Sequence, residues 1–239
     1  MWETIGIALA GTIVYLDTTA IAQLMICQPI IACPLWGLIV GRPEIGLFFG
    51  VGFQLLWLGN LPVGAAKFPE GNLGAFVATA LAARIPPASS GDPAWIVLTI
   101  ATFIGIITAH FGAEVTPLVR RIMNGFAPRV IAAAQAGNSQ RFRNIFAEAV
   151  AVHALAGFLF TALAFLIGKW IFALYLGHFA LAGLNPALID QTDALLSGLW
   201  PGLLGVGVAV LIGRFVKREN IGWFGAAAAV GILAGWLWL

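Results

Sequence analysis

One long apolar stretch, residues 28–75, is interrupted by prolines and glycines at short intervals. Its prolines are Pro29, Pro34, Pro43, Pro62 and Pro69. Polar side chains stand close to these breaks, at Gln28, Gln54, Asn60, Lys67, Glu70 and Asn72. Backbone that leaves a helix inside a bilayer must be buried in protein or face a watery cavity, because each unpaired amide costs several kcal/mol. Transporters place substrate sites at such breaks, so this stretch predicts one.

The composition of the whole chain points to a membrane protein. Of its 239 residues, 61% are hydrophobic and 9% are charged, whereas globular chains carry about 25% charged residues. A soluble domain is therefore excluded, and we predict an all-α polytopic membrane protein whose function resides in its membrane part. The first apolar stretch, residues 2–16, lacks a basic leader and a small-residue cleavage site, which favours a retained membrane segment over a signal peptide.

Apolar segments recur along the chain, and a span needs roughly 20 such residues. We expect about seven to nine transmembrane or re-entrant helical segments, with broken helices in the first third. The candidate spans are residues 2–16, 21–40, 45–58, 94–118, 146–167, 196–213 and 221–239, and residues 59–83 form a broken region.

Basic residues predict the orientation of the chain. One cluster comprises Arg120, Arg121, Arg129, Arg141 and Arg143, and a second comprises Arg214, Lys217 and Arg218. By the positive-inside rule both clusters are cytoplasmic, which requires an even number of crossings between them. The spans 146–167 and 196–213 supply two, so we expect residues 169–184 to be interfacial or re-entrant. Residues 119–145 are expected to form a cytoplasmic basic segment with a helix at the membrane surface.

Catalytic, metal-binding and phosphate-binding motifs are absent from the sequence, which has no HExxH, Walker loop or GxSxG. We therefore expect no catalytic residue, metal or cofactor, and the net charge of +2 gives no reason to expect nucleic acid. His110 and Glu114 are four residues apart on one helix face, which suits an interfacial pair or a proton relay. His153 is expected to hydrogen-bond to a neighbouring helix. Cys27 and Cys33 are interpreted as small buried hydrophobic residues.

The polar residues of the first third form a candidate substrate site. Amide side chains both donate and accept hydrogen bonds, which suits an uncharged substrate rich in hydroxyls, and Trp36 and Trp57 offer flat surfaces for a sugar ring. For any one of these residues, hydrogen bonding between helices, worth about 1 kcal/mol, is the alternative. Lys67 and Glu70, three residues apart, are either an ion pair that stabilises a re-entrant turn or substrate contacts.

Two consecutive elements, QPIIACPLWGLIVGRPEIGLFFGVG and FQLLWLGNLPVGAAKFPEGNLGA, carry a resemblance to a known family. Together they resemble the membrane IIC component of the mannose/fructose/sorbose family of the bacterial phosphotransferase system, most strongly over residues 17–83. The pattern of that family has an Arg where this chain has Gln28 and a Glu where it has Gln54, and Lys67 adds a charge.

The resemblance implies a single membrane-embedded IIC domain, residues 1–239, in the bacterial inner membrane, with residues 28–83 as its substrate-binding re-entrant region. It implies import of a hexose-type sugar with a IID membrane subunit and cytoplasmic IIA and IIB phosphocarriers, in a homotrimeric assembly of this subunit. The expected sugar-site residues are Asp17, Gln23, Gln28, Gln54 and Asn60, with Lys67, Glu70 and Asn72 at the re-entrant tip. The alternatives are a transport-deficient regulatory or scaffolding homologue and a facilitator without phosphorylation.

Overall fold

The structure is a computed structural model that describes residues 2–21, 23–58, 67–85 and 95–181, together with a few single positions between 196 and 226. Asn60 and the candidate spans 196–213 and 221–239 lie outside the continuous described ranges. Within those ranges the chain forms helices and no strand. The helices are α1 (Trp2–Thr19), α2 (Pro29–Ile39), α3 (Pro43–Trp57), α4 (Gly71–Ala82), α5 (Trp95–Asn124), α6 (Ala127–Gln135) and α7 (Ser139–Leu181).

The short helix α4 is the centre of the fold. It has 12 residues, about 18 Å of helix, which is too short to cross a hydrocarbon core of about 30 Å by itself. All of its residues except Asn72 are buried, and it contacts α1, α2, α3, α5 and α7. A side chain on Gly74 would collide with the carbonyl oxygen of Gly105 in α5. The absence of that side chain lets the backbones of α4 and α5 touch.

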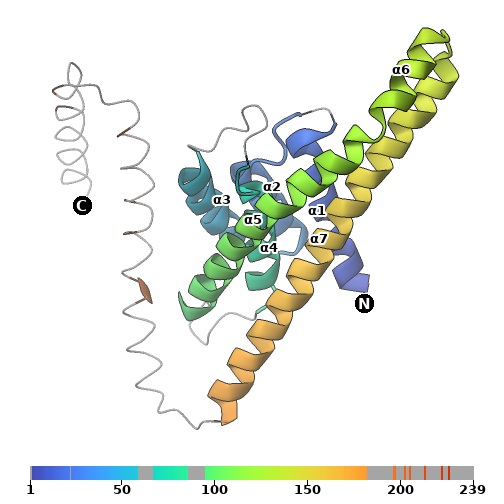
Figure 1. Ribbon diagram of the computed structural model, residues 1–239. Helices are drawn as coiled ribbons and strands as arrows, with labels where there is room; N and C mark the ends of the chain where they lie inside the picture. Colours follow the sequence, from blue (N-terminus) through green and yellow to red (C-terminus); the bar gives the residue numbers. More distant parts are fainter. Residues whose placement is uncertain are drawn as a thin grey trace.

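Helices α2 and α3 form a tight hairpin at one side of α4 (Figure 1). Its turn contains Gly41 at φ +73°, a left-handed conformation that glycine adopts without steric cost. Gly46 and Gly50 of α3 face α2: a Cβ on Gly46 would lie 2.6 Å from the carbonyl oxygen of Cys33, and one on Gly50 would lie 2.9 Å from that of Pro29. The GxxxG spacing in α3 is therefore a helix-packing contact.

Helices α5, α6 and α7 form a long hairpin whose far end projects beyond the body made by α1 to α4 (Figure 1). In the described part of the chain, Trp95–Gln135 and Ser139–Leu174 are long and apolar enough to cross a membrane. Large apolar side chains remain exposed along both arms, among them Phe103, Ile107 and Phe111 in α5 and Leu155, Leu159 and Leu163 in α7. These rows suit contact with lipid or with another membrane subunit.

The predicted span 21–40 is wrong in its first part, because α2 begins only at Pro29. Residues 23–28 form a loop in which Gln23 and Met25 have positive φ values of 49° and 65°. Gln28, directly before the proline, is extended at φ −59° and ψ 135°, as expected where the proline ring disfavours helical geometry in the preceding residue. The sequence there is apolar enough for a span, but the backbone is not helical.

The predicted boundary near residue 168 is also wrong, because α7 continues as one helix from Ser139 to Leu181. Residues 169–181 are therefore part of that helix and not a separate interfacial piece. Gly168 does not interrupt the helix, since a glycine costs only about 1 kcal/mol there, and its missing side chain leaves room for Leu81 of α4. In the basic segment, α5 extends to Asn124 and α6 packs against α7.

Candidate functional site

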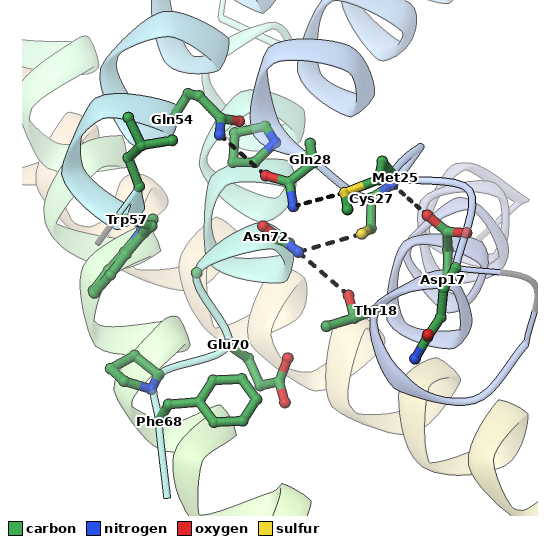
Figure 2. A pocket seen from close by; sticks show the side chains of 15 residues that line it. Asp17, Thr18, Met25, Cys27, Gln28, Gln54, Trp57, Phe68, Glu70 and Asn72 are labelled. Carbon is green, nitrogen blue, oxygen red and sulfur yellow. Dashed lines mark hydrogen bonds between the residues drawn. The ribbon is translucent and has the colours of Figure 1, made fainter. Parts of the chain in front are cut away.

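A cavity of about 580 Å³ lies where α1, the loop after it, the end of α3 and the start of α4 meet (Figure 2). This volume falls within the range of about 300–1,000 Å³ that is typical of small-molecule sites. Six of the residues expected from the sequence line it: Asp17, Gln23, Gln28, Gln54, Glu70 and Asn72. The fold thus brings together side chains from four segments of the first third of the chain.

Asp17 holds the loop that forms one wall of the cavity. Its Oδ1 accepts a hydrogen bond from the backbone N–H of Leu24 at 2.7 Å, and its Oδ2 accepts one from that of Cys27 at 2.8 Å. The side chain is only 7% exposed, and each of its oxygens serves a backbone donor that the non-helical loop leaves unpaired. Asp17 is therefore a positioning residue for this wall.

Gln28 and Gln54 form a hydrogen-bonded amide pair within the wall of the cavity (Figure 2). The Nε2 of Gln54 donates to the Oε1 of Gln28 at 3.0 Å, and the Oε1 of Gln54 accepts from the backbone N–H of Ile30 at 3.3 Å. Ile30 lies in the first turn of α2, where backbone N–H groups have no partner within the helix. Gln54 consequently links α3 to the start of α2.

Asn72 lies in the first turn of α4, between α1 and the loop. Its Nδ2 is 3.4 Å from the Oγ1 of Thr18 and 3.4 Å from the Sγ of Cys27 (Figure 2). The contact with Thr18 is at the long end of the range for an N–H···O hydrogen bond, and sulfur is a weak acceptor, so both contacts are weak. It is the one residue of α4 that is not fully buried.

Glu70 enters the cavity wall from the segment before α4 and is only 2% exposed. Its backbone N–H donates to the carbonyl oxygen of Ala109 at 2.9 Å, and the hydroxyl of Thr116 donates to its carboxylate. Gly112 of α5 makes room for the side chain, since a Cβ there would lie 2.5 Å from the Cβ of Glu70. Three residues of α5 thus fix Glu70: Ala109 binds its backbone, Gly112 leaves room for its side chain, and Thr116 binds its carboxylate.

The ion pairs differ from those that the sequence suggested. Lys67 pairs with Glu114 of α5 and not with Glu70, and the ion pairs among the described residues do not include His110 with Glu114. The Nδ1 of His110 is hydrogen-bonded at 2.8 Å to the carbonyl oxygen of Ile106, one turn earlier in the same helix. Spacing along the chain favoured the local partners, whereas the approach of residues 67–70 to α5 decided the actual ones. Lys67 does not line the cavity.

Of the two tryptophans considered for a sugar ring, only Trp57 lines the cavity. Its indole packs over the bare Cα of Gly71, and its ring centroid lies 5.9 Å from that of His110. The buried Nε1–H has no hydrogen-bond partner among the described residues. Trp36 instead makes an edge contact with Phe76 in the core, with a centroid distance of 5.4 Å.

The cavity also has lining residues that the sequence did not single out as site residues, namely Thr18, Met25, Cys27, Pro29, Leu58, Phe68, Pro69 and Gly71. Thr18 could have been found as the polar neighbour of Asp17 at the end of the first apolar segment. Cys27 is buried, as expected, yet it faces the cavity, and no sequence signal distinguishes it from Cys33. Asn60 lies outside the described residues.

Comparisons with known proteins agree with one another. The family model described as "PTS system sorbose-specific iic component" matches residues 1–230. The chain is 29% identical over 124 residues to the sorbose-specific EIIC component of Lacticaseibacillus casei, which covers 39% of this chain and 43% of that protein. It is 27% identical over 136 residues to the mannose-specific EIIC component of Escherichia coli strain K12, covering 47% of this chain and 51% of that protein.

A longer match, 26% identical over 208 residues, relates the chain to the fructose permease IIC component of Bacillus subtilis and covers 86% of this chain and 68% of that protein. The matched part spans about half the length of the sorbose and mannose relatives.

A solved structure entitled "Structure of membrane protein" has the same fold, with a TM-score of 0.67 and 18% identity over 100% of this chain and 95% of that one. Proteins of the IIC type are integral to the bacterial inner membrane, and the long apolar helices fit that location. Because the family model matches nearly the whole chain, this protein belongs to the family of sorbose-specific IIC components of the phosphotransferase system.

Proposed function

We propose that this chain is the sugar-translocating IIC subunit of a mannose-family, phosphoenolpyruvate-dependent phosphotransferase system and that it imports a hexose-type sugar. The observation that carries the proposal is the amide pair Gln28–Gln54, which faces Asn72 and Thr18 across a cavity of about 580 Å³. Amides and hydroxyls both donate and accept, so they can pair with any arrangement of sugar hydroxyls.

The charges around this cavity support a neutral, hydroxyl-rich substrate. Asp17 and Glu70 supply carboxylate oxygens, and neither Lys nor Arg is among the described residues that line it. Sugar hydroxyls can donate to carboxylates in charge-assisted hydrogen bonds, whereas an anionic substrate would find no countercharge here. Trp57 adds an apolar face and a buried Nε1–H that can donate to a hydroxyl. The names of the relatives, which mention sorbose, mannose and fructose, support the hexose class.

The break between α1 and α2 and the short helix α4 support a role in translocation, because non-helical backbone beside a cavity can rearrange without leaving amides in lipid. In this proposal residues 28–83 form the moving substrate region and residues 119–145 face the cytoplasm. The partners are a IID membrane subunit, which shares the transport path, and cytoplasmic IIA and IIB phosphocarriers, which phosphorylate the sugar. The assembled transporter contains three copies of this subunit.

Uptake of labelled sugar in cells that carry the complete transport system tests this function. Gln54→Ala should raise the KM for phosphoenolpyruvate-dependent uptake of sorbose, mannose or fructose by about 2- to 10-fold, the effect of one neutral hydrogen bond. Gln140→Ala is the matched control, because Gln140 is an exposed amide at the start of α7 whose Nε2 contacts Asn144. Its KM should equal that of the wild type.

Three other outcomes would contradict parts of this proposal. Uptake that persists unchanged after deletion of the gene would favour a regulatory or scaffolding homologue. Uptake of sugar that remains unphosphorylated would favour a facilitator. Equal KM values for Gln54→Ala and the wild type would overturn the assignment of the sugar site.

A further inference from the structure

A second cavity, of about 320 Å³, adjoins the proposed sugar cavity and shares Thr18 and Gln23 with it. Its other lining residues come from α1, α5 and α7: Tyr15, Thr116, Val119, Arg120, Met123 and His153. The shared wall contains two small or flexible polar side chains, and Gln23 belongs to the loop held by Asp17. The two cavities are therefore neighbours separated by this shared wall.

The two cavities have opposite charges on their linings. The first has the carboxylates of Asp17 and Glu70 and, among the residues described, no Lys or Arg. The second has Arg120 and His153 and, among the residues described, no Asp or Glu. A neutral polyol suits the first lining, and an anion suits the second.

The second cavity gathers hydrogen-bond donors of the kind that bind phosphate. The guanidinium of Arg120 presents N–H groups in a planar fork that matches phosphate oxygens, and Tyr15 adds a hydroxyl. The hydroxyl of Thr116 also lines this cavity, but its proton is donated to Glu70. The Nδ1 of His153 lies 3.2 Å from the carbonyl oxygen of Ala149 and must carry the proton there, because a carbonyl only accepts. The imidazole ring of His153 lines the cavity together with Arg120.

Glu70 and Thr116 connect the two cavities. Thr116, which lines the second, donates a hydrogen bond to the carboxylate of Glu70, which lines the first. Arg120 interacts electrostatically with the same carboxylate, and its guanidinium carbon lies 6.0 Å from the centre of the Phe68 ring. A phosphoryl group in the second cavity would compete with Glu70 for Arg120 and so alter a residue of the sugar cavity.

We propose that the cavity lined by Arg120, His153, Tyr15 and Thr116 binds the phosphoryl group of a phosphate monoester, namely the hexose phosphate formed from the sugar of the first cavity. This inference rests on the proposed function. The second cavity holds the phosphoryl group on donors, and the wall it shares with the first keeps the sugar ring within reach of Gln23 and Thr18. A phospholipid headgroup has related chemistry, but it carries no sugar part that the shared wall would recognise.

Calorimetric binding to the purified full-length chain tests the proposal, with mannose, mannose 6-phosphate and inorganic phosphate as probes. Arg120→Gln should weaken the binding of mannose 6-phosphate by about tenfold or more, the effect of losing a charge-assisted hydrogen bond, and should change its affinity more than that of mannose. Arg121→Gln is the matched control, because Arg121 is exposed and does not line the cavity, and it should bind like the wild type.

Two further variants keep the test informative if Arg120→Gln does not fold. Arg120→Lys retains the charge without the fork and should show a smaller loss, and His153→Gln should weaken mannose 6-phosphate binding relative to the control Gln140→Ala. The thermal unfolding midpoint of each variant confirms that it is folded. A parallel titration with phosphatidylglycerol nanodiscs identifies binding that comes from a lipid headgroup.

Equal losses in Arg120→Gln and Arg121→Gln, or dependence on Arg120 only with phosphatidylglycerol, would overturn this assignment. So would a failure of mannose 6-phosphate to bind the wild type. The sugar site and the phosphate site fail separately: a Gln54→Ala variant with unchanged mannose affinity contradicts the first alone, whereas mannose 6-phosphate affinity independent of Arg120 contradicts the second alone.

Discussion

At the scale of single residues, two of the three positions at which this chain departs from the pattern of the family it resembles are in contact. Gln28 and Gln54 stand where that pattern has a basic and an acidic residue, and they form a hydrogen bond of 3.0 Å. The amide pair keeps a link between α2 and α3 without a charge on either side chain. A buried charge needs a close partner to offset its desolvation, so the loss of both charges together leaves neither position with an unpaired ion.

A double-mutant cycle measures this coupling. Gln28→Ala and Gln54→Ala should each weaken sugar binding, and the double variant should be less impaired than the sum of the two, with a coupling of about 0.5–1.5 kcal/mol for one hydrogen bond. The measurement is the sugar affinity of the wild type, both single variants and the double variant. A cycle between Gln54 and the distant, exposed Gln140 should be additive, and additivity in the Gln28–Gln54 cycle itself would show that the pair does not act as a unit.

Asp17 shows how residue type and residue role can differ. The sequence placed it among the sugar contacts, and it does line the cavity. Both of its oxygens, however, already accept backbone N–H groups of the loop. An apolar sequence does not reveal that a side chain will bind backbone groups seven and ten residues further on. Nor does it reveal that Gln23 and Met25 adopt a left-handed backbone conformation. Its role in sugar recognition is a proposal, whereas its hydrogen bonds to the loop are part of the structure.

At the scale of secondary-structure elements, small residues decide how closely the helices pack. Gly74 of α4 and Gly105 of α5 meet backbone to backbone, so a side chain on either would collide with the other helix. This contact fixes the position of α4, which carries Asn72 into the cavity, relative to α5, which holds Glu70 through Thr116. The geometry of the cavity therefore depends on a contact that lies outside it.

Gly74→Ala should destabilise the protein by about 1–3 kcal/mol, the usual cost of overpacking a tight contact, and should reduce sugar affinity because α4 has to shift. Gly6→Ala in α1 is the matched control, since a Cβ there meets nothing within 4 Å. The unfolding free energy in detergent and the sugar affinity are measured for both variants. An unfolding free energy for Gly74→Ala equal to that of the control would mean that α4 and α5 are not held at this contact.

At the scale of the whole molecule, a compact group of short helices is packed against a long hairpin (Figure 1). Helix α7, with 43 residues, is about 65 Å long, roughly twice the thickness of the hydrocarbon core. Part of it must extend beyond that core, and α6 packs against its first turns. The only charged pair described there, Arg129 with Glu148, is half exposed, and ion pairs in water contribute little to stability.

Labelling from each side of the membrane tests the predicted orientation of this hairpin. In a Cys27→Ser/Cys33→Ser background, Ser139→Cys should react with an impermeant thiol reagent in inside-out vesicles and not in intact cells. Trp170→Cys, about 46 Å farther along α7, is the comparison position because Trp170 is exposed. Its labelling in intact cells should exceed that of Ser139→Cys. Labelling of Ser139→Cys in intact cells would show that the orientation is opposite to the one predicted from the basic residues.

The fold and the site were predictable to different degrees from the sequence. Composition and hydropathy were enough for the helical membrane class, and the breaks in residues 28–75 were enough to locate the polar cluster, since these signals are local. The length of α7 was not predictable, because the even number of crossings required between the two basic clusters favoured a separate piece at residues 169–184. The contact between Gly168 and Leu81, which forms part of the packing of α7, exists only in the folded protein. The count of full spans stays a prediction.

The sequence alone determined that this chain lies in a membrane, that its first third is broken, and which family it resembles. Only the tertiary structure decided which partners those polar residues have: Gln28 with Gln54, Lys67 with Glu114, and Glu70 with Thr116. It also separated a carboxylate-lined cavity from a second one lined by Arg120 and His153. The reason is physical, because apolar periodicity specifies which residues enter lipid, whereas pairing depends on where glycines allow helices to touch.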